Sequence, residues 1–279
     1  FDAETGEELW RKNLVQEYGT KIPPWYNGQC PLIEDDRVLI ATGGEALVVA
    51  LNKATGEEIW RAPNPESWLM SHASLMPARL GGVDQYLYTT LAGAHGIGTA
   101  GELLWHFPFK FNVSASPSPV ALDSELVYIT GGYDSGGAML RVSNGGDGFT
   151  TEGVFVHAAA EWNSEVQTPI VSDGHFFAVG KKRRGLFTCM DAAGKTVWDS
   201  DGKASFGLGS FILADGMFFI LEGKTGMLRL LEASTKEYKE LASAQVLGGH
   251  DVWAPLALSD GKLVIRDLER MVCLQVGKG

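Results

Sequence analysis

The side chains best suited to recognition chemistry are aromatic residues that stand just before apolar, β-like runs, with polar residues beside them. Tryptophan and tyrosine offer a flat apolar face with one polar atom, and a few convergent polar groups around such faces make a binding site. We therefore predict a ligand-binding set that comprises Trp25, Tyr26, Trp68, His72, Asn112, Trp162, Asn163, Glu165, His250, Asp251 and Trp253. Each tryptophan also fits a second role as a plug between neighbouring sheets, and His72 and His250 each also fit hydrogen-bonded loop residues.

No catalytic motif accompanies this set. The six histidines form neither a His-x-His nor a His-Glu-x-x-His spacing, and the chain has no Gly-x-Ser-x-Gly or Walker sequence. Many carboxylates stand in turns, where they face solvent and do not surround a metal; these are Glu34, Asp35, Asp36, Asp173, Asp215 and Asp260. The sequence therefore predicts no catalytic residue and no metal site.

Charge and hydropathy exclude two classes of partner. The formal net charge is −11, which repels a phosphate backbone, so nucleic acid is not expected to bind. The one basic cluster, Lys181 to Arg184, is followed by Gly185 and is interpreted as a solvated hairpin tip. No apolar run reaches the roughly 18 residues of a membrane-spanning helix, so no transmembrane segment is predicted.

A repeated turn shows which elements must position the aromatic residues. The segment Asp2-Ala-Glu-Thr-Gly-Glu-Glu-Leu-Trp10 recurs at 52–60, and shorter copies stand at 98–105 and 191–198. Asp or Asn and Thr can bond to the turn backbone, and Gly supplies a positive φ, so each copy predicts a tight hairpin. The tryptophans that end these copies are predicted to pack between sheets; they are Trp10, Trp60, Trp105 and Trp198.

A second pattern of apolar run, polar turn and apolar run precedes these turns. Its copies start at 31, 74, 119, 169, 211 and 255, at intervals of 42 to 50 residues. Together the two patterns describe four strands per unit, which is the size of a β-propeller blade. We therefore predict an all-β fold, a propeller of four-stranded antiparallel blades with six repeats in one domain over 1–279. In such a fold the loops that lead into each blade border the central channel, where the predicted set would lie.

Several stretches depart from the pattern. Residues 232–244 could be taken for a helix, but their register predicts strand, and Cys189 and Cys273 lie in apolar runs as expected for buried thiols. The last unit has no tryptophan strand after Val276. Residues 1–14 could supply this strand and close the last blade, or they could be the outer strand of a truncated blade that precedes residue 1. Both alternatives stay open.

The Asp-Ala-x-Thr-Gly-x-x-x-Trp turn resembles the PQQ-like repeat of quinoprotein propellers and of the outer-membrane-protein assembly lipoprotein. The chain is most similar in wording to exported bacterial proteins with PQQ-like repeats. The segments that carry this likeness are 56–60, 82–86, 168–171, 253–256 and 265–276. The resemblance implies a periplasmic or secreted location and about eight blades in the parent protein, two of them before Phe1.

The resemblance also frames the expected function. The leading hypothesis is a non-catalytic, extracytoplasmic scaffold that binds a protein, peptide or small ligand at its channel-face loops. The alternative is an oxidoreductase with PQQ and calcium that acts on an alcohol or sugar, with Glu165, Asn163 or Asp251 as metal ligands. Quinoprotein dehydrogenases carry adjacent cysteines beneath the cofactor, and no two cysteines are adjacent here. A third hypothesis is a structural blade array with no ligand of its own.

Overall fold

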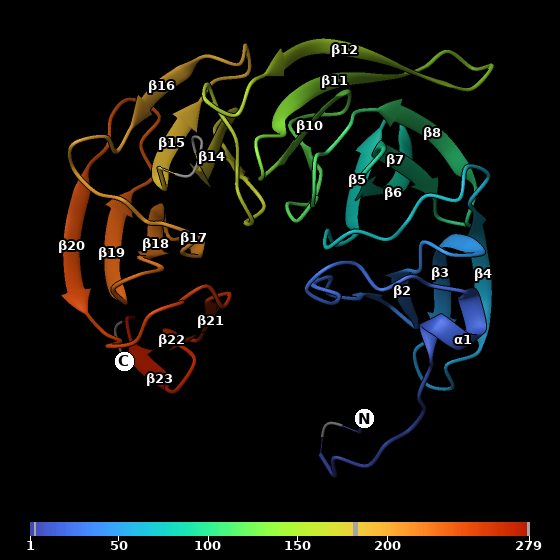
Figure 1. Cartoon of the computed structure of the whole chain (residues 1–279), viewed down its shortest axis with the longest axis horizontal. Helices are drawn as coiled ribbons and strands as arrows, with labels where there is room; N and C mark the ends of the chain where they lie inside the picture. The colour runs from blue at the N-terminus through green and yellow to red at the C-terminus, as the bar shows by residue number, and fades with distance from the viewer. Residues whose placement is uncertain (3, 181–183, 278–279) are drawn as a thin grey trace. The chain divides into compact units, whose positions relative to one another are not determined.

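The computed structural model describes residues 1–2, 4–180 and 184–277, and within them the chain forms six antiparallel sheets (Figure 1). In each sheet the strands follow one another in sequence order, so every sheet is a meander. We number the sheets as blades. Blade 1 holds β1 (Leu32–Glu34), β2 (Arg37–Ala41), β3 (Ala46–Asn52) and β4 (Glu58–Pro63). Blade 2 holds β5 (Met76–Leu80), β6 (Val83–Thr90), β7 (Gly93–Gly98) and β8 (Leu103–Pro108). Blade 3 holds β9 (Val120–Ala121), β10 (Leu126–Gly131), β11 (Gly136–Asn144) and β12 (Phe149–His157).

The second half continues in the same way. Blade 4 holds β13 (Ile170–Ser172), β14 (His175–Gly180), β15 (Leu186–Met190) and β16 (Thr196–Asp199). Blade 5 holds β17 (Phe211–Ala214), β18 (Met217–Leu221), β19 (Met227–Glu232) and β20 (Glu240–Gln245). Blade 6 has three strands among the described residues, β21 (Ala257–Ser259), β22 (Lys262–Arg266) and β23 (Met271–Gln275). The predicted all-β propeller fold is confirmed, and each predicted repeat start lies within two residues of a blade's first strand.

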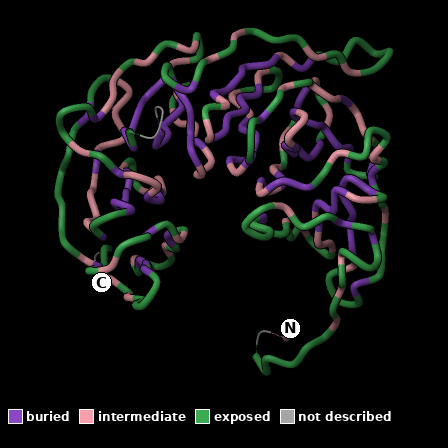
Figure 2. The backbone as a smooth tube through the Cα atoms, in the orientation of Figure 1, coloured by how far each residue is buried: buried purple, intermediate pink, exposed green. Residues whose placement is uncertain are grey.

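The chain divides into two compact units, Phe1–Val156 and His157–Gly279. The first unit holds blades 1 to 3, and its buried apolar side chains lie between consecutive blades; one cluster joins Leu39 and Leu47 of blade 1 to Tyr88 and Ile97 of blade 2. The second unit holds blades 4 to 6 and has its own buried clusters. Figure 2 shows that burial concentrates in the second and third strands of blades 1 to 4. In blade 5 the second strand, β18, is mostly buried, whereas β20 is exposed throughout. Each unit therefore builds its core from the central strands of its own blades.

The repeated turn forms as predicted. In blade 1 the Oδ1 atom of Asn52 accepts hydrogen bonds from the backbone N–H groups of Ala54 (2.9 Å) and Thr55 (3.1 Å). Gly56 then adopts a φ of +72°, which a residue with a Cβ atom adopts only at a cost. Asp2 makes the same two bonds to Glu4 and Thr5. The turn is thus encoded within six residues in these two copies.

These turns receive the tryptophan of the preceding segment. The ring of Trp10 lies on Gly56, where an added Cβ would approach the indole to 2.7 Å, and its Nε1 donates to the carbonyl of Lys53 (2.9 Å). Trp60 lies on Gly101 in the same way, with an added Cβ only 2.8 Å from the ring. The absence of a side chain on each glycine therefore lets consecutive segments pack closely, as the predicted packing role of these tryptophans requires.

The N-terminal residues differ from the prediction. None of the described residues before Leu14 belongs to a strand, and the predicted strand over 1–14 ends instead in a short helix, α1 (Leu14–Tyr18). The side chain of Asn13 accepts a bond from the backbone of Gln16, and Gly19 ends the helix with a φ of +63°. Asn and Gly are favoured at these two positions, which accounts for the helix over 14–18. The described residues before it pair with no strand, so they join no sheet.

Four further predictions concern single segments of the chain. Residues 232–244 form the end of β19, a turn and most of β20, so the strand prediction is confirmed. Cys189 is buried as predicted, but Cys273 is exposed because β23 is the last strand of blade 6 among the described residues. In the basic cluster, residues 181–183 lie outside the described residues, and Arg184 forms an ion pair with Asp201 (2.5 Å). No helix among the described residues is long and apolar enough to cross a membrane.

Candidate functional site

The loop that leads into blade 1 presents two aromatic side chains to solvent. Trp25 is 65% exposed and Tyr26 is 78% exposed. Both residues have left-handed backbone conformations, with φ of +62° and +68°, which are rare for bulky residues. Such conformations cost free energy and concentrate at functional sites, where the surrounding structure holds them in place. The contacts that hold this loop therefore define the candidate site.

Tyr133, in the turn between β10 and β11 of blade 3, is the first of these contacts. Its ring stacks on that of Trp25 with centroids 5.6 Å apart and planes 7° apart. Tyr133 and Asp134 are themselves left-handed, with φ of +55° and +61°. Two strained pairs of residues from blades far apart in the sequence thus meet through one ring stack. We call Trp25, Tyr26 and Tyr133 the aromatic platform.

Asn112, in the loop that leads into blade 3, holds the Tyr133 turn. Its side-chain Nδ2 donates to the carbonyl of Tyr133 (2.9 Å), and its backbone N–H donates to the hydroxyl of Ser135 (3.0 Å). This predicted site residue therefore supports the platform and does not project from it. Tyr133 itself was missed by the sequence analysis, although the Gly-Gly before it and the Ser-Gly-Gly after its neighbour Asp134 mark a tight turn.

His72, in the loop that leads into blade 2, ties the Trp25 loop to blade 3. Its Nε2 lies 2.8 Å from the carbonyl oxygen of Pro24, and its Nδ1 lies 3.0 Å from the hydroxyl of Ser114. Because a carbonyl only accepts, Nε2 carries the hydrogen, and in the neutral ring Nδ1 accepts from Ser114. Trp25, His72 and Asn112, predicted separately from three loops, are thus brought together in the first unit.

Trp68 lies apart from the platform, in a stack of three rings. Its ring centroid is 4.3 Å from that of His95 and 4.7 Å from that of His106, and the two imidazoles stack at 4.7 Å. His95 is fully buried, and Thr90 lies 2.9 Å from its Nε2. Burial, and secondarily the neighbouring His106, lowers the pKa of His95 to about 3. Trp68 is half-buried against the core of blades 1 and 2, which matches the alternative role of a plug.

In the second unit the predicted residues of the loop into blade 4 are buried. Trp162 is 0% exposed, so its ring offers no face to a ligand in this conformation. Asn163 and Glu165 are also buried, and the Nδ2 of Asn163 donates to Glu165 (3.3 Å). The backbone N–H of Glu165 donates to the carbonyl of Val179 in β14 (3.3 Å). These contacts fasten the loop to its own blade.

The loop into blade 6 is exposed. His250 lies beside its neighbour Asp251, with Nδ1 2.8 Å from Oδ2, and Asp251 has a φ of +57°. The ring of Trp253 is 47% exposed, and its carbonyl accepts a hydrogen bond from the hydroxyl of Ser210 (2.7 Å). Gln167, two residues after Glu165, donates to Ser210 (3.0 Å). The loops into blades 4, 5 and 6 are thus linked through main-chain and hydroxyl groups.

The hypothesis of PQQ and calcium binding depends on a metal site beside a stacking tryptophan. The described part of the chain contains no group of three or more His, Cys, Asp or Glu side chains placed to hold a metal ion. Trp162, the tryptophan next to Asn163, is fully buried, whereas Trp253, two residues after Asp251, is 47% exposed. Trp162 with Asn163 and Glu165 therefore does not fit this cofactor in the present conformation, and we derive no step through it.

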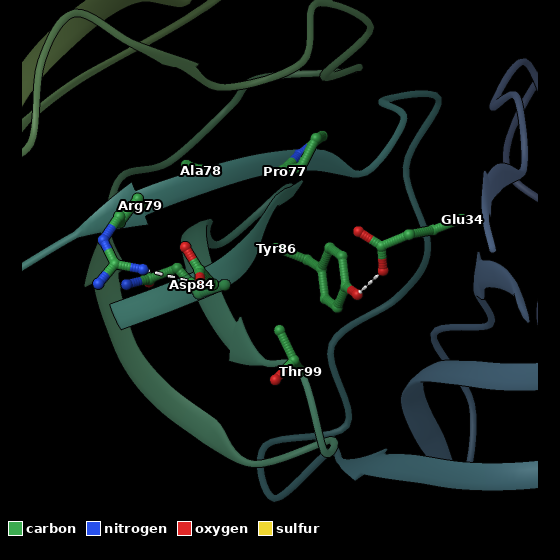
Figure 3. A pocket seen from close by; sticks show the side chains of 8 residues that line it. Glu34, Pro77, Ala78, Arg79, Asp84, Tyr86 and Thr99 are labelled. Atoms are coloured by element: carbon green, nitrogen blue, oxygen red, sulfur yellow. Dashed lines mark hydrogen bonds and ion pairs between the residues drawn. The ribbon is translucent and has the colours of Figure 1, made fainter. Parts of the chain in front are cut away.

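A cavity of about 290 Å³ lies between blades 1 and 2 and is lined by Glu34, Pro77, Ala78, Arg79, Asp84, Gln85, Tyr86 and Thr99 (Figure 3). The Tyr86 hydroxyl donates to the carboxylate of Glu34, which also pairs with Arg37 (2.8 Å). Burial and the Glu34 contact raise the pKa of Tyr86. Arg79 pairs with Asp84 (2.8 Å). Since the charged groups that line the cavity pair with each other or with Arg37, we interpret it as a joint between blades.

The fold, but no known family, is shared with solved structures. No protein-family model matches the chain, and no curated protein matches it. Among solved structures, BamB from Moraxella catarrhalis superposes with a TM-score of 0.60 and 14% identity over 87% of this chain and 67% of that chain. AztD from Citrobacter koseri superposes with a TM-score of 0.53 and 9% identity over 88% and 68%. The AfRom2 CNH domain superposes with a TM-score of 0.52 and 10% identity over 88% and 80%. At these identities the likeness shows the fold alone.

Proposed function

We propose that this chain is a non-catalytic β-propeller scaffold that binds a protein partner through the aromatic platform. The observation that carries the proposal is the presentation of Trp25 and Tyr26, exposed and left-handed, on a loop held by Tyr133 and His72. Exposed Trp and Tyr on a rigid support are the residues that dominate binding energy at protein interfaces. Holding them in place beforehand lowers the conformational entropy lost on binding.

The wider context agrees with a scaffold role. The repeats resemble the PQQ-like repeats of exported bacterial proteins, and we propose on that resemblance that the protein acts in the periplasm or outside the cell. A propeller fold hosts many activities, so the proposal rests on the platform and not on the fold. A protein or peptide partner is favoured over a small ligand because Trp25 and Tyr26 are widely exposed, whereas small-ligand sites bury most of their ligand in a concave pocket.

The test is selection from a displayed library of random twelve-residue peptides, with the whole chain as target. Peptides that bind the platform should lose at least about tenfold in affinity to Trp25→Ala, as expected for truncation of an interface hot spot. Ile33→Ala is the matched control, because Ile33 is exposed to a similar degree (63%) on β1. Circular dichroism and thermal unfolding verify that each variant folds. Selected peptides that bind Trp25→Ala and Ile33→Ala equally would overturn the proposal.

A further inference from the structure

The inference here rests on the proposed function and concerns the chemistry of the partner. The polar groups around the platform are largely engaged in holding it. Both ring nitrogens of His72 are hydrogen-bonded, to Pro24 and Ser114, and the Nδ2 of Asn112 donates to Tyr133. The side-chain oxygen of Asn27 accepts from the backbone of Gln29 (3.0 Å). A ligand recognised by many neutral hydrogen bonds, such as a sugar, would therefore find few free partners at this site.

Two kinds of group stay available at the platform. One face of the Trp25 ring is covered by Tyr133, and the high exposure of Trp25 leaves the other face open. Asp134, adjacent to Tyr133, is exposed and makes no hydrogen bond or ion pair with the described residues. The platform thus offers an open indole face and, in the adjoining turn that carries Tyr133, an unpaired carboxylate. The ring quadrupole and the negative charge each attract a cation.

The rest of the chain supports this preference. Its formal net charge is −11, which draws positively charged segments toward it over a longer range. Elsewhere in the protein, cationic side chains lie over aromatic rings: Arg61 lies 5.6 Å from the ring centroid of Tyr18, and Lys203 lies 5.1 Å from that of Tyr238. The open face of Trp25 can attract a cation in the same way, and it is exposed to solvent.

We propose that the occupant of the platform is a basic segment of the partner protein. An Arg or Lys side chain of that segment lies over the open face of Trp25, and Asp134, in the turn of Tyr133, attracts the positive charge of the same segment. The exposed Trp25 Nε1–H, which makes no hydrogen bond with the described residues, can donate to a carbonyl of the same segment. This assigns the partner by charge as well as by shape.

The experiment uses the peptides selected from the twelve-residue library. Those that depend on Trp25 are expected to be enriched in Arg or Lys over the unselected library. Replacing the key Arg by citrulline, which keeps the shape and removes the charge, should weaken binding at least about tenfold. Asp134→Asn should weaken it about three- to tenfold and should fold normally, because Asn tolerates a left-handed backbone.

Asp147→Asn is the matched control, since it removes the same charge from an exposed turn between β11 and β12. If Asp134→Asn and Asp147→Asn weakened peptide affinity equally, the effect of charge would be long-range attraction alone. That result would overturn the assignment of Asp134. Platform-dependent peptides that are neutral or acidic would overturn the basic partner and leave the proposed function standing. If no selected peptide depended on Trp25, the proposed function and this inference would both fall.

Discussion

His95 shows how burial sets the protonation state of a single residue. Its ring is enclosed by Trp68 and His106, and Thr90 lies within hydrogen-bond distance of its Nε2. Protonation of the imidazole is unfavourable in such a site, because the charged ring would lose its hydration. The imidazole is therefore neutral in the folded protein at any pH near neutrality, and it acts as an aromatic packing element.

This leads to a pH dependence of stability. The folded pKa of His95 is about 3, against about 6.5 for an unfolded histidine. Between these values the unfolded chain binds one more proton, so the stabilisation is complete above pH 6.5 and is lost as pH falls toward 3. His95→Phe should make the free energy of unfolding less pH-dependent in this window, by up to about 1.4 kcal/mol per pH unit. Urea denaturation of the wild type and the variant from pH 4 to pH 7 gives the free energy of unfolding at each pH. The same slope against pH for both proteins would contradict the prediction.

The residue scale also separates tryptophans that look alike in the sequence. Trp25 and Trp162 both precede the first strand of a blade, yet one is 65% exposed and the other is fully buried. The difference arises from what each loop contacts. The Trp25 loop is held by the side chain of His72, whereas the Trp162 loop pairs with β14 through its backbone, with Ser164 bridged to Gly180. Backbone pairing draws the second loop into its blade.

At the scale of the element, the joint between consecutive blades depends on a glycine beneath a tryptophan. Trp60 lies on Gly101 and also stacks on Tyr86, with ring centroids 6.4 Å apart. Arg37 adds a bond to the carbonyl of Thr99 in the same turn (3.0 Å). A side chain at Gly101 would thus disturb several contacts between blades 1 and 2 at once.

The corresponding prediction compares two glycines with positive φ in blade 2. Gly101→Ala and Gly82→Ala both pay about 1–2 kcal/mol for a left-handed Cβ. At Gly82 nothing lies within 4 Å of the added atom, whereas at Gly101 the Trp60 ring lies at 2.8 Å. We expect Gly101→Ala to lose about 1–3 kcal/mol more than Gly82→Ala, as in overpacked cores. Equilibrium urea unfolding gives both values, and equal losses would show that the joint yields without cost.

For the molecule as a whole, burial follows the order of strands in each blade. β3, β7 and β15 are buried along nearly their full length, while the outer strands β12 and β20 are mostly or fully exposed. An outer strand also has one edge without a ladder partner, so its amides open to solvent more readily.

Hydrogen exchange followed by mass spectrometry tests this pattern. Peptides that cover β3, β7 and β15 should exchange at least about a hundredfold more slowly than peptides that cover β12 and β20. Because each unit has its own core, the same order should hold within blades 1 to 3 and within blades 4 to 6. Uniform exchange across one of the units would show that its central strands do not form an independently stable core.

Much of the fold could be predicted from the sequence because its signals are local. The Asn52 turn, which joins the third and fourth strands of blade 1, is determined by contacts among residues 52–57, and the same contacts form at Asp2. The motif therefore marks a hairpin turn without knowledge of the rest of the chain. The helix α1 was missed because it begins at Leu14, where the predicted strand ends, and its local signals are only its two caps, Asn13 and Gly19.

The amino-acid sequence by itself determined the blade as the building unit, its repeat starts and the turns that carry the packing tryptophans. These properties depend on side chains within a few residues of one another. Only the tertiary structure decided which aromatic residues face solvent and which become core. Tyr133 meets Trp25 across 108 positions of sequence, and that contact depends on how whole blades pack together. Such long-range packing leaves no local signature, so the platform became visible only in three dimensions.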